Sequence, residues 1–383
     1  MQAQSTAPYR RAFPASALGV RAEACLALAS RYSDCRACVE ACPVEAIAIA
    51  DGEIAVEESC IACGRCAAVC PTEALAVEGF EIARPRDNTS IEIECASAPR
   101  DDGAAQARRV PCLQGVSVNH LLAWTLHTGA AVNVVERGCC TGCKGEDERA
   151  PLRDAVAETA ALMAETGLPE RLRPRVVEGA RQRAKRTNAP AANAIAGGSA
   201  TRRGFLGALA RSTAAHASIF EDEAGEPPAP SHGRRTPDAF LAARRRRLAL
   251  LRSLIERHVE GALPARLFPA VSIGADCSDH ALCAALCPTD ALTRHDDGAT
   301  RGIDFDPERC IACGDCERAC PSQAIALSGE GGGFEGPLIR HALENCQDCG
   351  RRFAAVSGEH RCQACRKSQA LARDGVRQLL AAR

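Results

Sequence analysis

Two stretches of the chain place four cysteines and a proline at one spacing, C-x2-C-x2-C-x3-C-P. The first comprises Cys60, Cys63, Cys66, Cys70 and Pro71, and the second comprises Cys310, Cys313, Cys316, Cys320 and Pro321. Both begin C-I-A-C-G, so the agreement extends beyond the cysteines. Thiolates are soft ligands, and cysteines spaced this closely favour metal ligation over free thiols or disulfides.

The cysteine content, 24 in 383 residues, indicates a reducing compartment. A disulfide scaffold is short and secreted, whereas this chain is long and its cysteines fall in tight C-x-x-C clusters. No apolar run reaches the roughly 18 residues that span a bilayer, and residues 1–20 lack the apolar core of a signal peptide. We therefore expect a cytoplasmic protein without a membrane span.

The remaining composition narrows the class of partner and of domain. The formal net charge of −1 gives no electrostatic reason to expect a nucleic-acid partner. Aromatic residues make up 3% of the chain, so small metal-stapled domains fit better than large aromatic cores.

The first stretch lies in a segment, residues 25–80, that is expected to form one module. An incomplete copy of the spacing precedes it, namely Cys35, Cys38, Cys42 and Pro43. Residues 46–49 and 53–56 flank Asp51-Gly52, which predicts a hairpin, and residues 74–77 should close the sheet. Residues 1–24, before the module, are expected to be a flexible arm.

This module resembles the two-cluster bacterial ferredoxins, in which the cysteine before proline crosses to the other cluster. The resemblance implies that Cys42, Cys60, Cys63 and Cys66 hold one [4Fe–4S] cluster. It implies that Cys35, Cys38 and Cys70 supply three ligands of the other. Tyr32 stands where the first cysteine of the incomplete run is expected. Cys25 is a candidate fourth ligand; the alternative is a buried Cys25 beside a three-iron cluster.

Residues 263–328 are expected to form a second module of this kind around the second stretch. Residues 291–293 and 302–305 flank a predicted turn, and residues 324–327 should close the sheet. Its first half has the spacing Cys277-x5-Cys283-x3-Cys287-Pro288, which resembles the seven-iron ferredoxins.

The resemblance to the seven-iron ferredoxins implies two ligand sets in this module. The [4Fe–4S] set is Cys287, Cys310, Cys313 and Cys316, and the [3Fe–4S] set is Cys277, Cys283 and Cys320. Asp276, Asp279 or His280 could complete a fourth iron. A carboxylate is a weak ligand for such iron, so a three-iron cluster or a labile fourth iron is favoured.

Residues 81–145 show helix and strand patterns of a different kind. Residues 91–95 and 131–135 read as strands and residues 116–126 as a helix, which predicts a small α/β domain with parallel pairing. Ligands gather at the carboxyl ends of such strands. The cysteines expected there are Cys95, Cys112, Cys139, Cys140 and Cys143.

The layout of this domain is similar to that of the small iron–sulfur subunits that accompany hydrogenases and heterodisulfide reductases. A further cluster, [2Fe–2S] or [4Fe–4S], is favoured at Cys95–Cys143. Zinc and a redox-active thiol pair remain open. Five cysteines for four positions would leave Cys139 or Cys140 spare.

The C-terminal segment, residues 338–383, carries two C-x-x-C knuckles that resemble a zinc ribbon. The ligands would be Cys346, Cys349, Cys362 and Cys365. Structural zinc is favoured; a rubredoxin-like iron and free cysteines are the alternatives. Residues 367–380 should form an amphipathic helix.

Three segments connect these parts. Residues 151–186 are expected to be helical, broken near Pro169 and Pro174. Residues 187–237 are expected to be a linker, and their Arg202-Arg203 pair resembles a twin-arginine motif but is better explained as a basic helix start. Residues 238–262 should form a basic helix whose arginine run is either a solvated surface or a docking surface for an acidic partner.

The chain is therefore expected to be an α+β protein with two ferredoxin-like dicluster modules, a small α/β domain, helical linkers and a metal knuckle. At least two [4Fe–4S] clusters are expected, with three or four favoured. No nucleotide fingerprint and no nucleophile with a base is found, so no catalytic residue is assigned.

The favoured function is electron transfer, as a relay subunit or partner of a larger redox enzyme whose donor and acceptor the residues do not name. Arg36, Arg65, Arg309 and Arg318 lie inside or beside the cysteine runs, where they either tune the reduction potential or solubilise the domain. The alternative is a cluster carrier or maturation factor for a metallo-oxidoreductase. A third possibility is a thiol–disulfide enzyme centred on Cys139, Cys140 and Cys143.

Overall fold

The computed structural model combines short helices with short strands. It describes residues 18–80, 90–98, 107–138, 140, 143, 151–179, 237–328, 331–355 and 358–381, all within one compact unit. Cys139, Arg202-Arg203 and nearly all of the predicted linker lie outside these residues. No helix in the described part is long and apolar enough to cross a bilayer.

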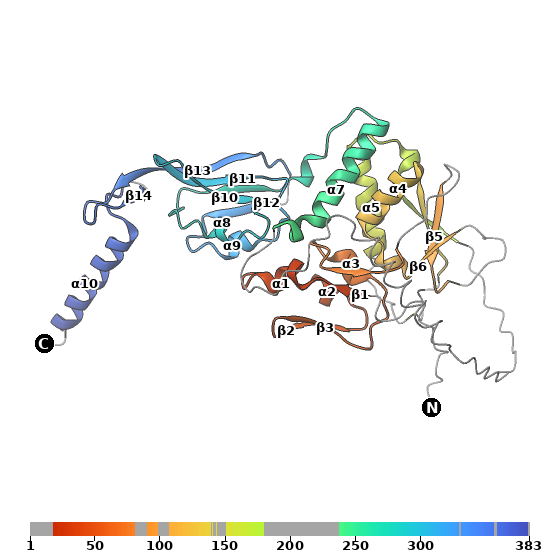
Figure 1. The fold of residues 1–383 in the computed structure, drawn as a ribbon, viewed down its shortest axis with the longest axis horizontal. Coiled ribbons are helices and arrows are strands. Elements are labelled where there is room, and N and C mark those ends of the chain that lie inside the picture. Colours follow the sequence, from red (N-terminus) through yellow and green to blue (C-terminus); the bar gives the residue numbers. More distant parts are fainter. Residues whose placement is uncertain are drawn as a thin grey trace, which may run out of the picture. The chain divides into compact units, whose positions relative to one another are not determined.

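The first module is built from two antiparallel strand pairs and four short helical turns (Figure 1). Its strands are β1 (Leu18–Val20), β2 (Ile47–Ala50), β3 (Glu53–Val56) and β4 (Leu75–Val77). Its helices are η2 (Ala22–Ala24), α1 (Leu26–Ala29), α2 (Ala37–Glu40) and α3 (Arg65–Val69). The predicted hairpin is confirmed, since β2 pairs with β3 and both Asp51 and Gly52 have the positive φ of a type I′ turn.

The expectation of a flexible arm is wrong for residues 18–24. β1 pairs antiparallel with β4, and Ala24 is fully buried under the module. The pairing satisfies the backbone of the closing strand β4, which the β2–β3 hairpin leaves unpaired.

The second module repeats this arrangement. β9 (Ala270–Ile273) pairs with β12 (Ile325–Ser328), and β10 (Leu292–Asp296) pairs with β11 (Thr300–Phe305). Its helices are η5 (Ala265–Leu267), α8 (Leu282–Leu286) and α9 (Asp315–Arg318). The predicted hairpin and closing strand are therefore present.

The C-terminal segment continues the sheet of the second module. β13 (Gly336–Asn345) pairs with β11 at one end and with β14 (Arg352–Ala354) at the other. The terminal helix α10 (Gln363–Ala381) includes the residues for which an amphipathic helix was predicted.

The α/β domain is a four-stranded parallel sheet in the order β6-β5-β7-β8. The strands are β5 (Ile91–Cys95), β6 (Arg108–Val110), β7 (Val132–Glu136) and β8 (Arg175–Glu178). The predicted parallel pairing of the first and last expected strands is confirmed by β5 and β7. Glu94, buried in β5, accepts from Arg109 at 2.8 Å and from Arg137 at 2.7 Å.

Helices cover this sheet. α4 (Val118–Thr128) begins at a capping box formed by Ser117 and His120 and ends at Gly129, whose φ is +69°. η3 (Leu113–Gly115) precedes it, and α5 (Pro151–Glu165) and η4 (Glu170–Leu172) follow. Apolar side chains of the sheet and of both α-helices form one core.

Of the predicted helical segment 151–186, the structure describes residues 151–179, and these contain α5 and the short turn η4. Residues 175–178 form β8, which extends the sheet beyond the boundary predicted for the α/β domain. Pro174 disfavours a helix there, and the β-branched pair Val176-Val177 suits a strand.

The predicted basic helix is confirmed as α7 (Pro237–His258). Leu248, Leu251 and Leu254 are buried against α4 and α5 in a second core. Its arginine run is only partly a solvated surface: Arg245 and Arg246 are exposed, whereas Arg244 and Arg247 are part-buried. The solvated-surface interpretation therefore holds for only part of the run, since Arg244 donates to the Pro307 carbonyl and Arg247 donates to Asn119 Oδ1.

Gly115 marks the closest approach of the α/β domain to the first module. A Cβ atom there would lie 2.3 Å from the Cys63 carbonyl oxygen and 2.6 Å from the Phe80 ring. The two backbones can therefore touch only because this residue has no side chain.

We predict that Gly115→Ala lowers the free energy of unfolding by about 1–3 kcal/mol, because a backbone carbonyl must move to admit the methyl group. The lower melting temperature can be measured by circular dichroism. Gly19→Ala is the control, since its Cβ would meet only the Ala76 oxygen, at 3.8 Å. Equal melting temperatures for the two variants would contradict the close approach.

Candidate iron–sulfur and metal sites

The loops that carry the cysteines share one backbone geometry. The third residue after each Cys-Pro cysteine has a φ of 51–54°; these residues are Glu45, Glu73, Asp290 and Gln323. Ala62 and Ala312, inside the two complete runs, have φ of 51° and 53°. Left-handed non-glycine residues cost energy and persist where the surroundings require them, which is typical of ligand-binding loops.

This backbone turns N–H groups toward sulfur. The Ala46 N–H donates to Cys42 Sγ at 3.2 Å, and the Ala74 N–H donates to Cys70 Sγ at the same distance. Hydrogen bonds to sulfur are one of the means by which proteins set cluster potentials.

Hydroxyl groups near sulfur were missed in the sequence. Thr72, Thr289 and Ser322 each lie 3.6 Å, oxygen to sulfur, from the cysteine two residues earlier. The signal was available, because three of the four Cys-Pro pairs are followed by Ser or Thr.

The first module gathers its cysteines in two groups. Burial, together with the nearby thiols of Cys63, Cys60 and Cys42, raises the pKa of Cys66. The first group therefore comprises Cys60, Cys63 and Cys66 of the complete run and Cys42 of the incomplete run.

The second group of this module includes Cys25. Burial and the thiols of Cys70, Cys25 and Cys35 raise the pKa of Cys38 to about 11. The four cysteines line one small cavity with apolar neighbours such as Ile54 and Leu75. Cys25 is 7% exposed, and the buried turn of η2 and α1 brings it there.

The second module gathers its cysteines in the same crossed manner. Burial and the thiols of Cys313, Cys310 and Cys287 raise the pKa of Cys316 to about 12. These four cysteines line a cavity whose other lining residues are mostly apolar, among them Val271, Leu292 and Phe305.

The remaining group of the second module has three cysteines. Burial and the thiols of Cys277 and Cys320 raise the pKa of Cys283 to about 11. Asp279 lies near Cys277 and is part-buried, which raises its pKa. His280 is occupied elsewhere: its Nδ1 lies 2.7 Å from the Ser278 hydroxyl and its Nε2 lies 3.0 Å from the Gln363 amide.

In the α/β domain the structure brings two of the expected cysteines together. Cys95 ends β5, and its thiol lies within hydrogen-bond reach of Cys112, which raises the pKa of Cys112 together with burial. Cys143 donates its N–H to the Cys140 carbonyl at 3.0 Å. Among the described residues, these cysteines do not form a group of three or more thiols within 4.8 Å of one another.

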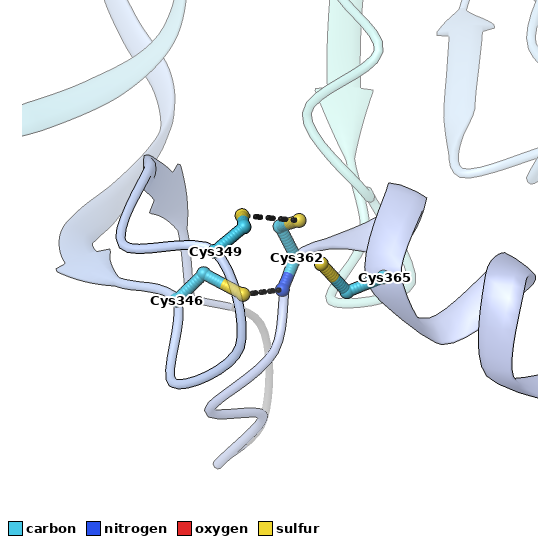
Figure 2. Close-up of side chains that lie close together, drawn as sticks. All are labelled: Cys346, Cys349, Cys362 and Cys365. Atoms are coloured by element: carbon cyan, nitrogen blue, oxygen red, sulfur yellow. Dashed lines mark hydrogen bonds between the residues drawn. The ribbon is translucent and has the colours of Figure 1, made fainter.

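The C-terminal knuckles do form such a group. The four sulfurs of Cys346, Cys349, Cys362 and Cys365 lie within 4.8 Å of one another (Figure 2). Cys349 Sγ and Cys362 Sγ are 3.8 Å apart. A tetrahedron with Zn–S bonds of about 2.3 Å has an edge of about 3.8 Å, so the donor set and its size fit zinc.

The backbone pre-organises this group. The Cys362 N–H donates to Cys346 Sγ at 3.3 Å and lowers the pKa of that thiol (Figure 2). The Gly350 N–H donates to the Cys346 carbonyl at 2.9 Å, and its φ of +70° closes the knuckle turn. The thiols come from the end of β13, the turn before β14 and the start of α10.

Two family models match separate segments of the chain. Residues 273–324 match the 4Fe-4S dicluster domain. Residues 32–80 match the LdpA Fe-S cluster-binding domain.

Two curated relatives share part of the chain. One belongs to the Na(+)-translocating ferredoxin:NAD(+) oxidoreductase complex of Acetobacterium woodii, of which it is a subunit, and is 39% identical over 51 residues. The other is the polyferredoxin protein MvhB of Methanothermus fervidus, 38% identical over 68 residues. The matched segments are 13% and 16% of this chain, and 14% and 16% of the respective relatives. The chain therefore carries ferredoxin-like iron–sulfur cluster-binding domains in two separate segments.

Proposed function

We propose that the chain is a multi-cluster iron–sulfur electron-transfer protein that acts as a relay subunit or partner of a larger redox enzyme. The observation that supports this most is that each module contains two groups of cysteines. Each group includes cysteines from both runs of its module. Iron–sulfur clusters exchange single electrons and need no catalytic residue. The named relatives, a subunit of an oxidoreductase complex and a polyferredoxin, support the same role.

The proposal assigns each group a cluster. In the first module Cys42, Cys60, Cys63 and Cys66 hold one [4Fe–4S] cluster, and Cys25, Cys35, Cys38 and Cys70 hold the other. In the second module Cys287, Cys310, Cys313 and Cys316 hold a [4Fe–4S] cluster. Cys277, Cys283 and Cys320 hold a [3Fe–4S] cluster or, with Asp279, a cluster whose fourth iron is labile.

Two further metal sites belong to the proposal. One is a further iron–sulfur cluster held by Cys95 and Cys112, whose thiols lie within hydrogen-bond reach of each other, together with cysteines of the 139–143 segment. The knuckle cysteines hold a structural zinc, which leaves no open coordination position for catalysis.

Anaerobic purification followed by iron analysis and an EPR-monitored redox titration tests this function. Two loaded modules contain about 15 iron atoms, and each cluster should titrate as a reversible one-electron centre. Fewer than about 12 iron atoms per chain would contradict two loaded modules. Transfer of intact clusters to an apo-acceptor, faster than any electron exchange, would instead favour the cluster-carrier alternative.

The first module offers a sharper prediction about its irregular group. We expect Cys25→Ala to convert a [4Fe–4S] centre into a three-iron centre, because the group would be left with three thiolates. The new signal should appear by EPR after mild oxidation. Cys35→Ala is the comparison, since it removes a predicted ligand of the same cluster. An unchanged spectrum in Cys25→Ala alone would place Cys25 outside the ligand set.

The knuckle predicts a separate metal. Cys349→Ser should reduce zinc content to near zero and leave iron content unchanged, as measured by plasma mass spectrometry, because a structural site needs all of its thiolates. His360→Asn is the matched control: it lies beside the knuckle, and its Nδ1 faces Glu344 at 3.4 Å. Loss of zinc in the histidine variant, or iron in place of zinc in the wild type, would contradict the assignment.

A further inference from the structure

Arg318, between two cysteines of the second complete run, reaches into the first module. Its Nη2 donates to the Cys313 carbonyl at 2.5 Å and to Asp315 Oδ1 at 2.8 Å, both in the second module. Its Nε donates to the Tyr32 carbonyl at 2.6 Å, and its Nη1 lies 3.2 Å from Asp34 Oδ1, both in the first module. One guanidinium therefore joins the loop before Cys35 to the loop of Cys313.

The two modules also border one cavity. Its volume is about 250 Å³, and its lining includes Cys70 and Pro71 of the first module and Ile311, next to Cys310, of the second. Cys70 belongs with Cys35 and Cys38, and Cys310 belongs with Cys313. The neighbouring groups are thus the irregular one of the first module and the regular one of the second.

Arginine side chains of helix α7 contact both modules near these loops. Arg244 donates to the carbonyls of Pro307 and Glu308, just before Cys310, at 2.7 and 2.5 Å. Arg246 pairs with Glu73 of the first module at 3.2 Å. The arginine run of α7 therefore contacts the loop before Cys310 in the second module and the loop after Cys70 in the first.

The opposite side of the first module meets the α/β domain. Gly115 packs against the Cys63 carbonyl, and Cys112 is within electrostatic reach of Cys63. The group of Cys42, Cys60, Cys63 and Cys66 therefore neighbours the α/β domain, whereas the group of Cys25 and Cys35 neighbours the second module.

We propose that the cysteine groups form one linear series and that Arg318 positions the step between the modules. The order is Cys95–Cys112, Cys60–Cys66 with Cys42, Cys25–Cys38 with Cys70, Cys310–Cys316 with Cys287, and Cys277–Cys283 with Cys320. This rests on the proposed function. At the junction one electron passes from the reduced centre at Cys35–Cys38 to the oxidised centre at Cys313–Cys316, or the reverse. One centre is oxidised as the other is reduced, and no proton or further reactant is needed.

The charge of Arg318 suits such a junction. Thiolate-bound clusters carry net negative charge, so two of them in neighbouring loops repel each other, more so when reduced. A guanidinium between the loops offsets this repulsion and favours the reduced state on both sides. A role confined to the second module would require only the contacts to Cys313 and Asp315.

A double-mutant cycle on the cluster-loaded full chain tests the junction. Asp34→Asn, Arg318→Gln and the double variant are titrated with EPR detection. Because Asp34 is in one module and Arg318 in the other, we expect non-additive shifts: Asp34→Asn should move a midpoint potential in the wild type and move it by less when Arg318 is absent. Arg301→Gln is the matched control, since its ion pair with Asp296 stays within the β10–β11 hairpin.

The outcomes separate the proposals. Additive shifts, or equal non-additivity with Arg301→Gln, would overturn the junction while leaving the proposed function intact. Failure of the wild type to show several reversible one-electron centres would instead refute the proposed function.

Magnetic coupling provides a second measurement that does not depend on these variants folding. In the fully reduced wild type, neighbouring paramagnetic centres broaden and split each other's EPR signals. We expect Cys38→Ala, which alters the cluster of its own group, to change the broadening and splitting of the signal of the Cys313–Cys316 centre, and Cys66→Ala to leave them unchanged. A change with Cys66→Ala alone would reverse the order within the first module and overturn the proposal.

Discussion

The crossing of one cysteine from each run to the other group is the constraint on which both modules depend. Cys42 and Cys287 must lie beside runs that begin more than a hairpin away along the chain, and each crossing is completed by a Cys-Pro turn with a left-handed residue after it. The hairpins β2–β3 and β10–β11 supply the reversal that makes this possible. A module this small has little apolar core, so the proposed ligation by its thiolates would supply stabilisation that a larger core supplies in other domains.

Arginine side chains connect loops of different domains, as the grouped cysteines connect loops within one module. Arg244 and Arg318 donate mainly to backbone carbonyls of cysteine-bearing loops, so their contacts depend on loop conformation as well as on charge. A planar guanidinium with several fixed donors suits this task better than a lysine ammonium. The same cations lie near thiolates whose charge grows when a centre is reduced, and docking and electrostatic compensation are therefore achieved by one set of residues.

Local patterns predicted the hairpins and the position of α7, because each depends on residues close in sequence. The parallel pair β5–β7 was predicted from the order strand, helix, strand, since Ile91 and Val132, which it pairs, are distant in sequence. The contacts that define the candidate sites were harder to predict. Cys25 lies between the short helical turns η2 and α1, which follow a strand, β1, that was not expected and pairs with the distant β4. β8 likewise pairs with β7, although the composition of its segment predicts a helix. The contact of Arg318 with Tyr32 spans 286 positions, and no periodicity in the chain indicates it.

The proposed linear order changes what the two irregular groups mean. If the groups are in series, the one with Cys25 lies in the interior, between the regular groups of the two modules, and every electron passing between modules must use it. With Cys25 in place of the expected cysteine at Tyr32, four thiolates would be available at this interior position. The group of Cys277, Cys283 and Cys320 lies at an end, where a missing thiolate affects only exchange with the outside. The group that departs furthest from the regular spacing is thus the one whose loss would leave electron transfer among the other groups of the series intact.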